Sequence, residues 1–256
     1  MSFFIQKPKL LYAPMLATFG GGSARSYGRS LGGGGPDGAI VTSNLVSYFD
    51  ANTYSGSGST WNDFYNNYTA TLTNTTYSTA NEGYFTFDSS GDKAITNLQR
   101  SNADFSYCCW CRLSSTAASG DEHAIDTFEN SSAEWTLLGA TGTPSAPVAQ
   151  FVVDNNSSKT TLNGSTTFSR NQWVHIVGTR ASYNGEMKLY LNASLDGTGS
   201  STTGAISGVE PLAIGSSNVG GGRWDGDIAI VQTYSDVLTA SEVLQNYNAQ
   251  KWRFGL

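Results

Sequence analysis

From residue 39 onward, apolar residues fall in short runs that are separated by turn-forming Gly, Asn, Asp and Ser. One run alternates cleanly, so that Met187, Leu189 and Leu191 share one face of a strand and Lys188 and Tyr190 share the other. Such runs predict strands near residues 45–50, 84–88, 93–98, 105–112, 135–139, 148–153, 173–180, 187–193, 211–214 and 227–234. The pattern therefore predicts an all-β fold, a two-sheet antiparallel jelly-roll sandwich.

Two local signals refine this expectation. Asn184 and Gly185 predict a tight hairpin between the strands at 173–180 and 187–193, because Asn-Gly supplies the positive φ angles that such a turn needs. One short helix is expected at about 239–249, where Thr239 and Glu242 have the spacing of a capping box.

The first 38 residues differ from the rest. Residues 20–38 are mostly Gly and Ser, which lose too much backbone entropy on folding to form a structure alone. Residues 1–38 carry four basic residues against one acidic, a net of +3, whereas the total is −6, which leaves −9 for residues 39–256. We therefore expect an extended basic arm at 1–38 and one sandwich domain at 39–256.

The arm contains an apolar segment that is too short for a core of its own and is suited to a partner's groove or sheet edge. A purely solubilising role for the four basic residues is the alternative. The residues expected to anchor the arm to a partner are Lys7, Lys9, Leu11, Tyr12, Met15, Phe19, Arg25 and Arg29.

Composition excludes several other classes. The acidic body lacks a basic stripe with interleaved aromatics, so nucleic acid is not an expected partner. No apolar stretch approaches the length of a membrane span, so no membrane partner is expected. The opening segment is interrupted by Lys7 and Pro8, which argues against a secretion signal.

Cys108, Cys109 and Cys111 lie on one predicted strand and are expected to be buried thiols in a protein made in a reducing compartment.

Five segments stand in a distinctive order along the chain. They are LVSYFD at 45–50 followed by SGSGSTWND at 55–63, YFTFDSSGD at 84–92, the strand around Trp110 at 105–113, NQWVH at 171–175, and WDGDIAIVQTY at 224–234 leading into the predicted helix. This order resembles the laminin G-like and pentraxin-like branch of the concanavalin A-like lectin and glucanase superfamily over roughly residues 39–254.

The SGSGSTW run and the arm are similar to versions of this domain in structural proteins of tailed bacteriophages, cyanophages among them. That resemblance implies a non-enzymatic virion structural protein, either a capsid decoration or a tail or fibre component. The arm would bind other virion proteins, the protein would be made in the host cytoplasm, and a homo-oligomer is expected. A free carbohydrate-binding lectin is the alternative, and a glycoside hydrolase is a more distant one.

The spacing of Glu and Asp residues along the chain tests the glycoside hydrolase alternative. Retaining glucanases of this superfamily carry Glu, Asp and Glu on alternate positions of one strand, which places all three on one face. The nearest segment here has Glu122, Asp126 and Glu129, but Ala124 stands where the pattern needs Asp. We therefore expect no catalytic residues. His175 lies within an apolar strand and is expected to be structural.

Calcium is the expected cation, because relatives of this domain bind it through Asp and Asn side chains at a loop edge. The resemblance places acidic loop residues at Asp88, Asp92, Asp225 and Asp227. Asp also caps turns by bonding its own backbone, and that role stands beside calcium binding.

A cell-surface glycan is a further expected partner, and it would need aromatic rings beside hydrogen-bonding groups. Trp61, Tyr65, Tyr183 and Trp224 lie in or beside predicted loops and are the candidates for stacking on sugar rings. Packing beneath a loop is the alternative role for them. The remaining strand tryptophans, Trp110, Trp135 and Trp173, are expected to fill the core.

Overall fold

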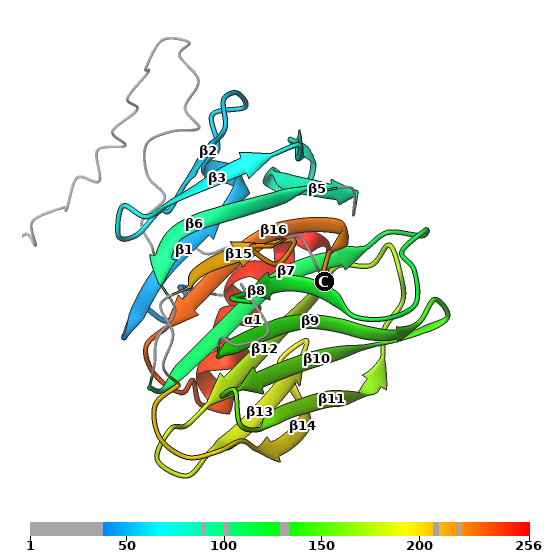
Figure 1. Ribbon diagram of the computed structural model, residues 1–256. Helices are drawn as coiled ribbons and strands as arrows, with labels where there is room; N and C mark the ends of the chain where they lie inside the picture. Colours follow the sequence, from blue (N-terminus) through cyan, green and yellow to red (C-terminus); the bar gives the residue numbers. More distant parts are fainter. Residues whose placement is uncertain (1–37, 89–90, 100–102, 129–133, 207–209, 220–221) are drawn as a thin grey trace, which may run out of the picture.

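The computed structural model describes residues 38–88, 91–99, 103–128, 134–206, 210–219 and 222–256. Over these residues the chain forms two antiparallel sheets of eight strands each, packed face to face, with one α-helix near the C-terminus (Figure 1). The predicted all-β sandwich with a short C-terminal helix is confirmed. The predicted arm and its eight anchoring residues lie outside the described residues.

The first sheet has the order β14-β13-β12-β7-β16-β5-β4, and β1 also pairs with β16. Its strands are β1 (Leu45–Asp50), β4 (Thr76–Ser78), β5 (Tyr84–Asp88), β7 (Phe105–Leu113), β12 (Val174–Arg180), β13 (Glu186–Leu191), β14 (Ser194–Ser200) and β16 (Asp225–Tyr234). The long central strand β16 pairs with β7 on one side and with β5 and then β1 on the other.

The second sheet has the order β11-β10-β9-β8-β15-β6-β3-β2. Its strands are β2 (Thr60–Asn62), β3 (Thr69–Thr73), β6 (Lys93–Gln99), β8 (Glu122–Asp126), β9 (Trp135–Thr143), β10 (Ala146–Asp154), β11 (Lys159–Thr167) and β15 (Pro211–Ile214). Strands β9 and β10 form a long hairpin in which Trp135 lies opposite Asp154 and Leu137 lies opposite Val152.

All ten predicted strands are present, and β12 and β13 form the predicted hairpin. Gly185 has the expected positive φ, 74°, but Asn184 does not, and the Gly185 N–H donates to the Ala181 carbonyl across a longer turn than predicted. The prediction missed six strands, namely β2, β3, β4, β8, β11 and β14. These are short or polar. In β11, for example, Leu162 is the one buried residue in a strand of Thr, Asn, Ser and Gly, so no apolar run marks it.

The main core lies between the two sheets and is rich in aromatic rings, among them Phe85, Phe105 and Phe151. The sheets approach closely where Gly178 of β12 faces Phe151 of β10, since a Cβ at Gly178 would lie 2.6 Å from the Phe151 ring. Cys109 and Cys111 are buried in this core, and Cys108 is buried on the other side of β7 as a free thiol, as predicted.

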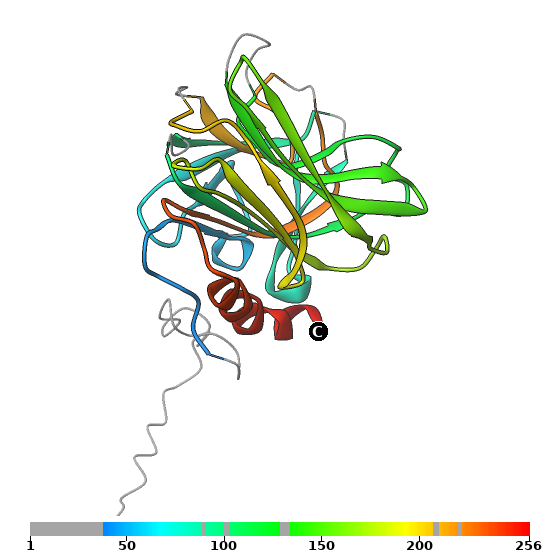
Figure 2. The ribbon, with the colours of Figure 1, turned by 90° about the horizontal axis from the view of Figure 1, so that it is seen from below.

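Helix α1 (Ala240–Lys251) lies against the outer face of the first sheet (Figure 2). The predicted capping box is confirmed, because the Thr239 hydroxyl accepts from the Glu242 N–H and the Glu242 side chain accepts from the Thr239 N–H. Val243 and Ala249 of α1 belong to one buried apolar cluster with Val177 of β12. Among the described residues, no helix is long and apolar enough to cross a membrane.

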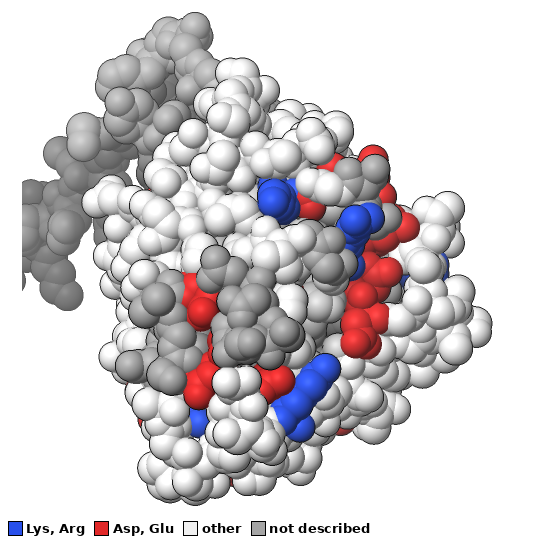
Figure 3. Space-filling view, in the orientation of Figure 1, with Lys and Arg blue, Asp and Glu red and all other residues white. Residues whose placement is uncertain are grey.

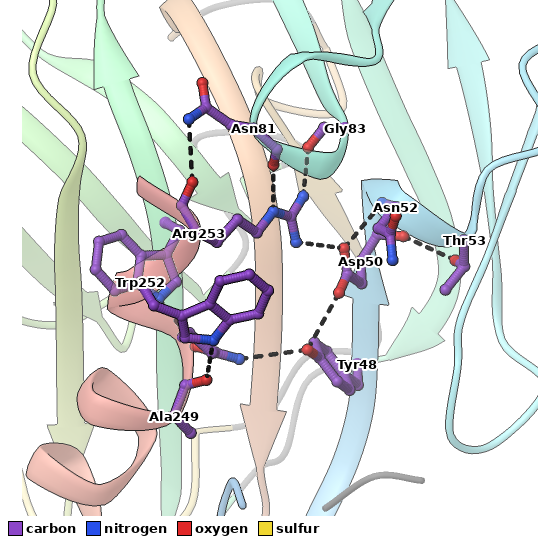
Figure 4. Close-up of polar contacts among 11 residues, drawn as sticks. Tyr48, Asp50, Asn52, Thr53, Asn81, Gly83, Ala249, Trp252 and Arg253 are labelled. Atoms are coloured by element: carbon purple, nitrogen blue, oxygen red, sulfur yellow. Dashed lines mark hydrogen bonds and ion pairs between the residues drawn. The ribbon is translucent and has the colours of Figure 1, made fainter. Parts of the chain in front are cut away.

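A buried ion pair fixes the chain beyond α1. The guanidinium of Arg253 lies 2.7 Å from Oδ1 of Asp50, at the end of β1, and donates to the carbonyl oxygens of Asn81 and Gly83 (Figure 4). The other Asp50 oxygen accepts from the Tyr48 hydroxyl at 3.2 Å. Both partners of this ion pair are nearly inaccessible, so its charges are neutralised by hydrogen bonds rather than by solvent.

An aromatic stack completes this layer. The ring of Trp110 on β7 stacks on His175 at 5.0 Å between centroids, on Tyr247 of α1 at 5.5 Å and on Phe254 at 4.4 Å. Trp173 packs against Phe254 as well. The predicted structural role of His175 and the predicted burial of Trp110 and Trp173 are confirmed.

Candidate functional site

The outer face of the second sheet carries a hollow of about 190 Å³ over β8–β11. Polar, charged and aromatic side chains meet there on an apolar floor. The residues that line it are Asp121, His123, Phe128, Trp135, Leu137, Gln150, Val152, Lys159 and Gly222.

Strand alternation explains the floor of the hollow. In β9 and β10, Leu138 and Phe151 belong to the core between the sheets, whereas Leu137 and Val152 belong to the hollow. Successive residues of a strand point to opposite faces, so the two faces of this hairpin are both apolar at its centre. The floor of the hollow is therefore built on hydrogen-bonded strands, whereas Asp121, Phe128 and Gly222 border it from outside the strands.

A bulge in β8 brings His123, which lines the hollow, into contact with the buried Asp126. The β8–β9 register shifts between His123 and Ile125, and both Ala124 and Ile125 belong to the core. His123 and Asp126 consequently meet on the outer side, with Nδ1 of His123 2.5 Å from Oδ2 of Asp126. The spacing of three residues would separate them in a regular strand.

The His123 ring is held from two sides. Asp126 is fully buried, and its Oδ1 accepts the Phe128 N–H at 2.6 Å while its Oδ2 contacts the imidazole. The backbone of Gly222 packs so closely that a Cβ there would lie 1.9 Å from the His123 ring. With Nδ1–H directed to the carboxylate, the neutral imidazole presents Nε2 as a hydrogen-bond acceptor.

The side-chain oxygen of Gln150 is a second hydrogen-bond acceptor in the hollow. Its Nε2 donates to Oδ1 of Asp121 and to Oδ1 of Asn163, both at 3.2 Å, and Asp121 Oδ1 also accepts from the Thr141 hydroxyl. An ionised carboxylate only accepts, so it is the nitrogen of the Gln150 amide that faces Asp121. The Gln150 Oε1 is buried and has no hydrogen-bond partner among the described residues.

Trp135 and Phe128 form an aromatic corner of the hollow, with ring centroids 5.4 Å apart and planes at 80°. The Lys159 ammonium lies 4.9 Å from the centroid of the Trp135 ring. The prediction that Trp135 fills the core is wrong, because its ring is only partly buried and lines the hollow. Alternation within β9 places Trp135 on the same face as Leu137, and this was the signal available in the sequence.

The other carboxylate of β8 is directed elsewhere. Glu122 Oε2 accepts the N–H of Asp225, on β16 of the opposite sheet, at 2.8 Å. Burial raises the pKa of Glu122 to about 7, although this hydrogen bond acts in the opposite direction. Glu129, the third residue of the segment compared with the glucanase pattern, lies outside the described residues.

The four calcium candidates do not form one site in the described structure. Asp88 lies opposite Asp225 in the β5–β16 ladder, and Asp92 Oδ2 accepts the Asp88 N–H at 3.0 Å. Asp227 instead pairs with Arg112, with Oδ2 2.6 Å from the guanidinium. Within the described ranges, no three His, Cys, Asp or Glu side chains are grouped so that they could hold a metal ion.

The four glycan candidates are also separated. Trp61 and Trp224 are fully buried in the main core, so the prediction that they stack on a sugar is wrong. Trp61 lies in β2, a strand too short to be recognised from its sequence. Tyr65 packs partly buried against the cluster beneath α1, and Tyr183 is 79% exposed in the β12–β13 turn. None of the four lines the hollow.

Comparison with known proteins agrees with the fold. Residues 87–244 match the family model described as the concanavalin A-like lectin/glucanases superfamily. No curated protein matches the chain in sequence. Among solved structures, a Trypanosoma rangeli sialidase in complex with the inhibitor DANA is similar, with a TM-score of 0.60 and 16% identity over 84% of this chain. The chain spans about a third of that sialidase, 34% of its length.

Two further structures are similar at the same level. Domain 4 of AbnA, a GH43 extracellular arabinanase from Geobacillus stearothermophilus in complex with arabinotriose, has a TM-score of 0.60 and 17% identity, covering 81% of this chain and 98% of that domain. A tryptophan-to-alanine mutant of HCR/D has a TM-score of 0.62 and 17% identity, covering 81% of this chain and 52% of that one. With the family match over more than half of its length, the chain belongs to the concanavalin A-like lectin/glucanases superfamily.

Proposed function

We propose that the protein binds a carbohydrate in the hollow over β8–β11. Saccharides are recognised by aromatic rings that contact the C–H faces of the sugar and by polar groups that bind its hydroxyls. The hollow combines the Trp135 and Phe128 rings with the polar groups of Asp121, His123 and Gln150. The arabinotriose complex of a structurally similar domain supports the same class of ligand.

The observation that carries this proposal is the unpartnered oxygen of Gln150. A buried acceptor without a hydrogen bond costs about 1–3 kcal/mol, so its retention requires a reason. The amide nitrogen of Gln150 already donates two hydrogen bonds, whereas the carbonyl oxygen has none among the described residues. An O–H or N–H donor from outside the protein can therefore bind to this oxygen. A sugar hydroxyl that enters the hollow is such a donor, and Trp135 stands at the same hollow to receive the ring.

We further propose that the protein is a binding module rather than an enzyme. Hydrolysis by two carboxyl groups requires an acid and a nucleophile or base that flank one bond. Asp126 is fully buried and engaged by His123 and Phe128, while Glu122 reaches the opposite sheet. These contacts support binding without cleavage.

A glycan array followed by titration tests the carbohydrate proposal, with arabinotriose and sialic acid included as single ligands. Trp135→Ala is expected to weaken binding of the array hits at least about tenfold, equivalent to about 1.4 kcal/mol. Phe64→Ala is the matched control, since Phe64 is an exposed ring, 39% accessible, that does not line the hollow. Equal affinity of the wild type and the Trp135 variant for every hit would refute the proposal.

Residues 1–38 motivate a second proposal, that the sandwich is displayed on a virion. Their net charge of +3 against an acidic body, and their Gly-rich composition, suit an arm that orders against another protein. The protein would then be a homo-oligomeric capsid, tail or fibre component that presents the hollow to host glycans. Electron microscopy of the assembled particle tests this, because the arm should run between neighbouring subunits. A protein found only free in solution would contradict it.

A further inference from the structure

A second depression lies at one side edge of the sandwich, away from the hollow. It is a trough of about 430 Å³, bordered by the segment that leads into β2 and by the β3–β4 connection. Strand β2 is the edge of the second sheet and β4 the end of the first, so the trough lies where the two sheets part. Its volume falls within the range of about 300–1,000 Å³ that is usual for small-molecule sites.

Aromatic rings form one wall of the trough. Tyr54, Tyr77 and Phe85 pack edge to face or tilted, with centroids between 4.9 and 5.4 Å apart. Phe85 is buried behind the two tyrosines, which are themselves only partly buried. The tyrosines therefore present ring surface to the trough on a support that belongs to the main core.

The opposite wall is backbone and small polar side chains. Gly56, Gly58 and Ser59 come from the Ser-Gly run that precedes Trp61, and Asn74 comes from the β3–β4 turn. The run is tied in place, because the Tyr54 hydroxyl donates to the Gly58 carbonyl at 2.6 Å and Ser59 O accepts the Leu72 N–H at 2.8 Å. Gly56, Gly58 and Ser59 are exposed, so the backbone of this run forms part of the trough surface.

The trough carries no charge among its lining residues, which include no Asp, Glu, Lys, Arg or His. This distinguishes it from the hollow, which holds Asp121, His123 and Lys159. In Figure 3, the surface over β2 and β3 is free of blue and red atoms, whereas charged atoms gather lower on the same face. A ligand of the trough is therefore expected to be neutral, since a charged one would lose solvation without gaining a partner.

We propose that this trough is a second ligand site and that it takes an uncharged oligosaccharide. Aromatic ring surface beside hydroxyl, amide and backbone groups is the combination that neutral sugars require. An extended peptide that adds to a sheet edge is the competing occupant. The short edges disfavour it, because β2 and β4 have three residues each and offer few ladder hydrogen bonds.

The test uses the full chain with Trp135→Ala, so that binding at the hollow is suppressed, on an array of neutral oligosaccharides. The proposal expects residual hits whose affinity falls at least tenfold when Ser59→Glu is added, because the longer side chain occupies part of the trough that Ser59 lines. Ser59 is exposed, so this change leaves the core intact. Ser145→Glu, at an exposed serine of the β9–β10 turn, is the matched control.

A second variant, on the opposite wall of the trough, shows whether lost binding reflects the trough itself or only a changed conformation of the Ser-Gly run that carries Ser59. Tyr77→Ala removes ring surface and should abolish the same hits, while the thermal unfolding midpoint reports whether the fold persists. Absence of any neutral hit on the Trp135 variant would overturn the proposal, as would hits that tolerate both Ser59→Glu and Tyr77→Ala, or binding of extended peptides alone. Failure of the hollow is distinguished from these outcomes, since in that case no hit of the wild-type protein, charged or neutral, loses affinity in Trp135→Ala.

Discussion

The outer face of each sheet carries a tryptophan and a histidine, but these side chains are covered on the first sheet and uncovered on the second. On the first sheet, Trp110 and His175 are fully buried beneath α1 and the C-terminal residues, which the Arg253–Asp50 ion pair holds in place. On the second sheet, Trp135 and His123 line a hollow, and no helix of the described chain covers them (Figure 2). One face therefore contributes stability, and the other has side chains available to a ligand.

The two histidines show the difference in chemical terms. Burial lowers the pKa of His175 to about 3, and neither ring nitrogen has a hydrogen-bond partner among the described residues. His175 thus acts as a flat, neutral packing surface. His123 contacts Asp126 through Nδ1 and lines the hollow. The two histidines therefore differ in their polar surroundings, since His123 has a carboxylate partner and His175 has no hydrogen-bond partner among the described residues.

The largest expected effects concern the covered face. Arg253→Met should destabilise the protein by about 3–5 kcal/mol, because Asp50 would remain buried without its partner. Urea denaturation measures the change. Lys188→Met is the matched control, since the Lys188–Glu186 pair at 3.1 Å is partly exposed to solvent and should contribute at most about 1 kcal/mol. Equal losses for the two variants would contradict the assigned role of the ion pair.

Exchanging tryptophan for alanine on each face sharpens the comparison. Trp110→Ala should cost about 3–5 kcal/mol of stability, because three ring contacts and a fully buried side chain are lost. Trp135→Ala should cost about 1 kcal/mol or less while it removes glycan affinity. Thermal unfolding and ligand titration on the same samples report both quantities. A larger stability loss for Trp135→Ala would show that its ring packs rather than binds.

The pH dependence of stability should reveal His175. Its folded pKa of about 3 lies below the value near 6.5 of an unfolded chain, so the unfolded state binds the proton more readily between these values. The contribution of neutral His175 to the free energy of unfolding is therefore fully present above pH 6.5. It decreases by about 1.4 kcal/mol per pH unit as the pH falls from 6.5 toward 3. His175→Leu should remove this contribution, as measured by denaturation at several pH values. An unchanged slope would show that His175 is solvated.

A smaller effect of opposite sign is expected from Glu122. Its folded pKa of about 7 is above the unfolded value of 4.5, so its contribution is complete below pH 4.5 and is lost as the pH rises through 7. At about 1.4 kcal/mol per pH unit over these 2.5 units the loss is about 3.5 kcal/mol at most, and solvent screening of the partly accessible carboxyl makes it smaller. Glu122→Gln should therefore flatten the stability profile between pH 4.5 and 7. A profile that the substitution leaves unchanged would place Glu122 in solvent.

The sequence predicted the strands that carry apolar runs, the β12–β13 hairpin, α1 and its cap. The sequence-based predictions were wrong where the position of a side chain depends on which elements pack against its strand. Trp61 was assigned to a loop because β2 has three residues, and Trp135 was assigned to the core because a strand pattern does not say which face stays uncovered. Residue type alone gave the same interpretation for Trp110 and Trp135, and only one was correct.

The pairing of His123 with Asp126 was not predictable for a different reason. A one-residue bulge in β8 reverses the side on which the later residues of the strand point, and nothing in the local composition marks it. The family resemblance supplied the fold, and the match over residues 87–244 agrees with it. For the calcium candidates, the resemblance did not predict that Asp227 is engaged by Arg112, and calcium binding itself stays a prediction.

The central claim is that the uncovered face of the second sheet binds carbohydrate through Trp135 and Gln150. The most direct measurement is a nitrogen-15 NMR titration of the full chain with the strongest glycan-array hit. Shifts of the Trp135 indole N–H and the Gln150 side-chain amide, with an unchanged Trp110 indole N–H beneath α1, are the predicted result. Shifts confined to residues outside the hollow, or no shift at saturating glycan, would contradict the account.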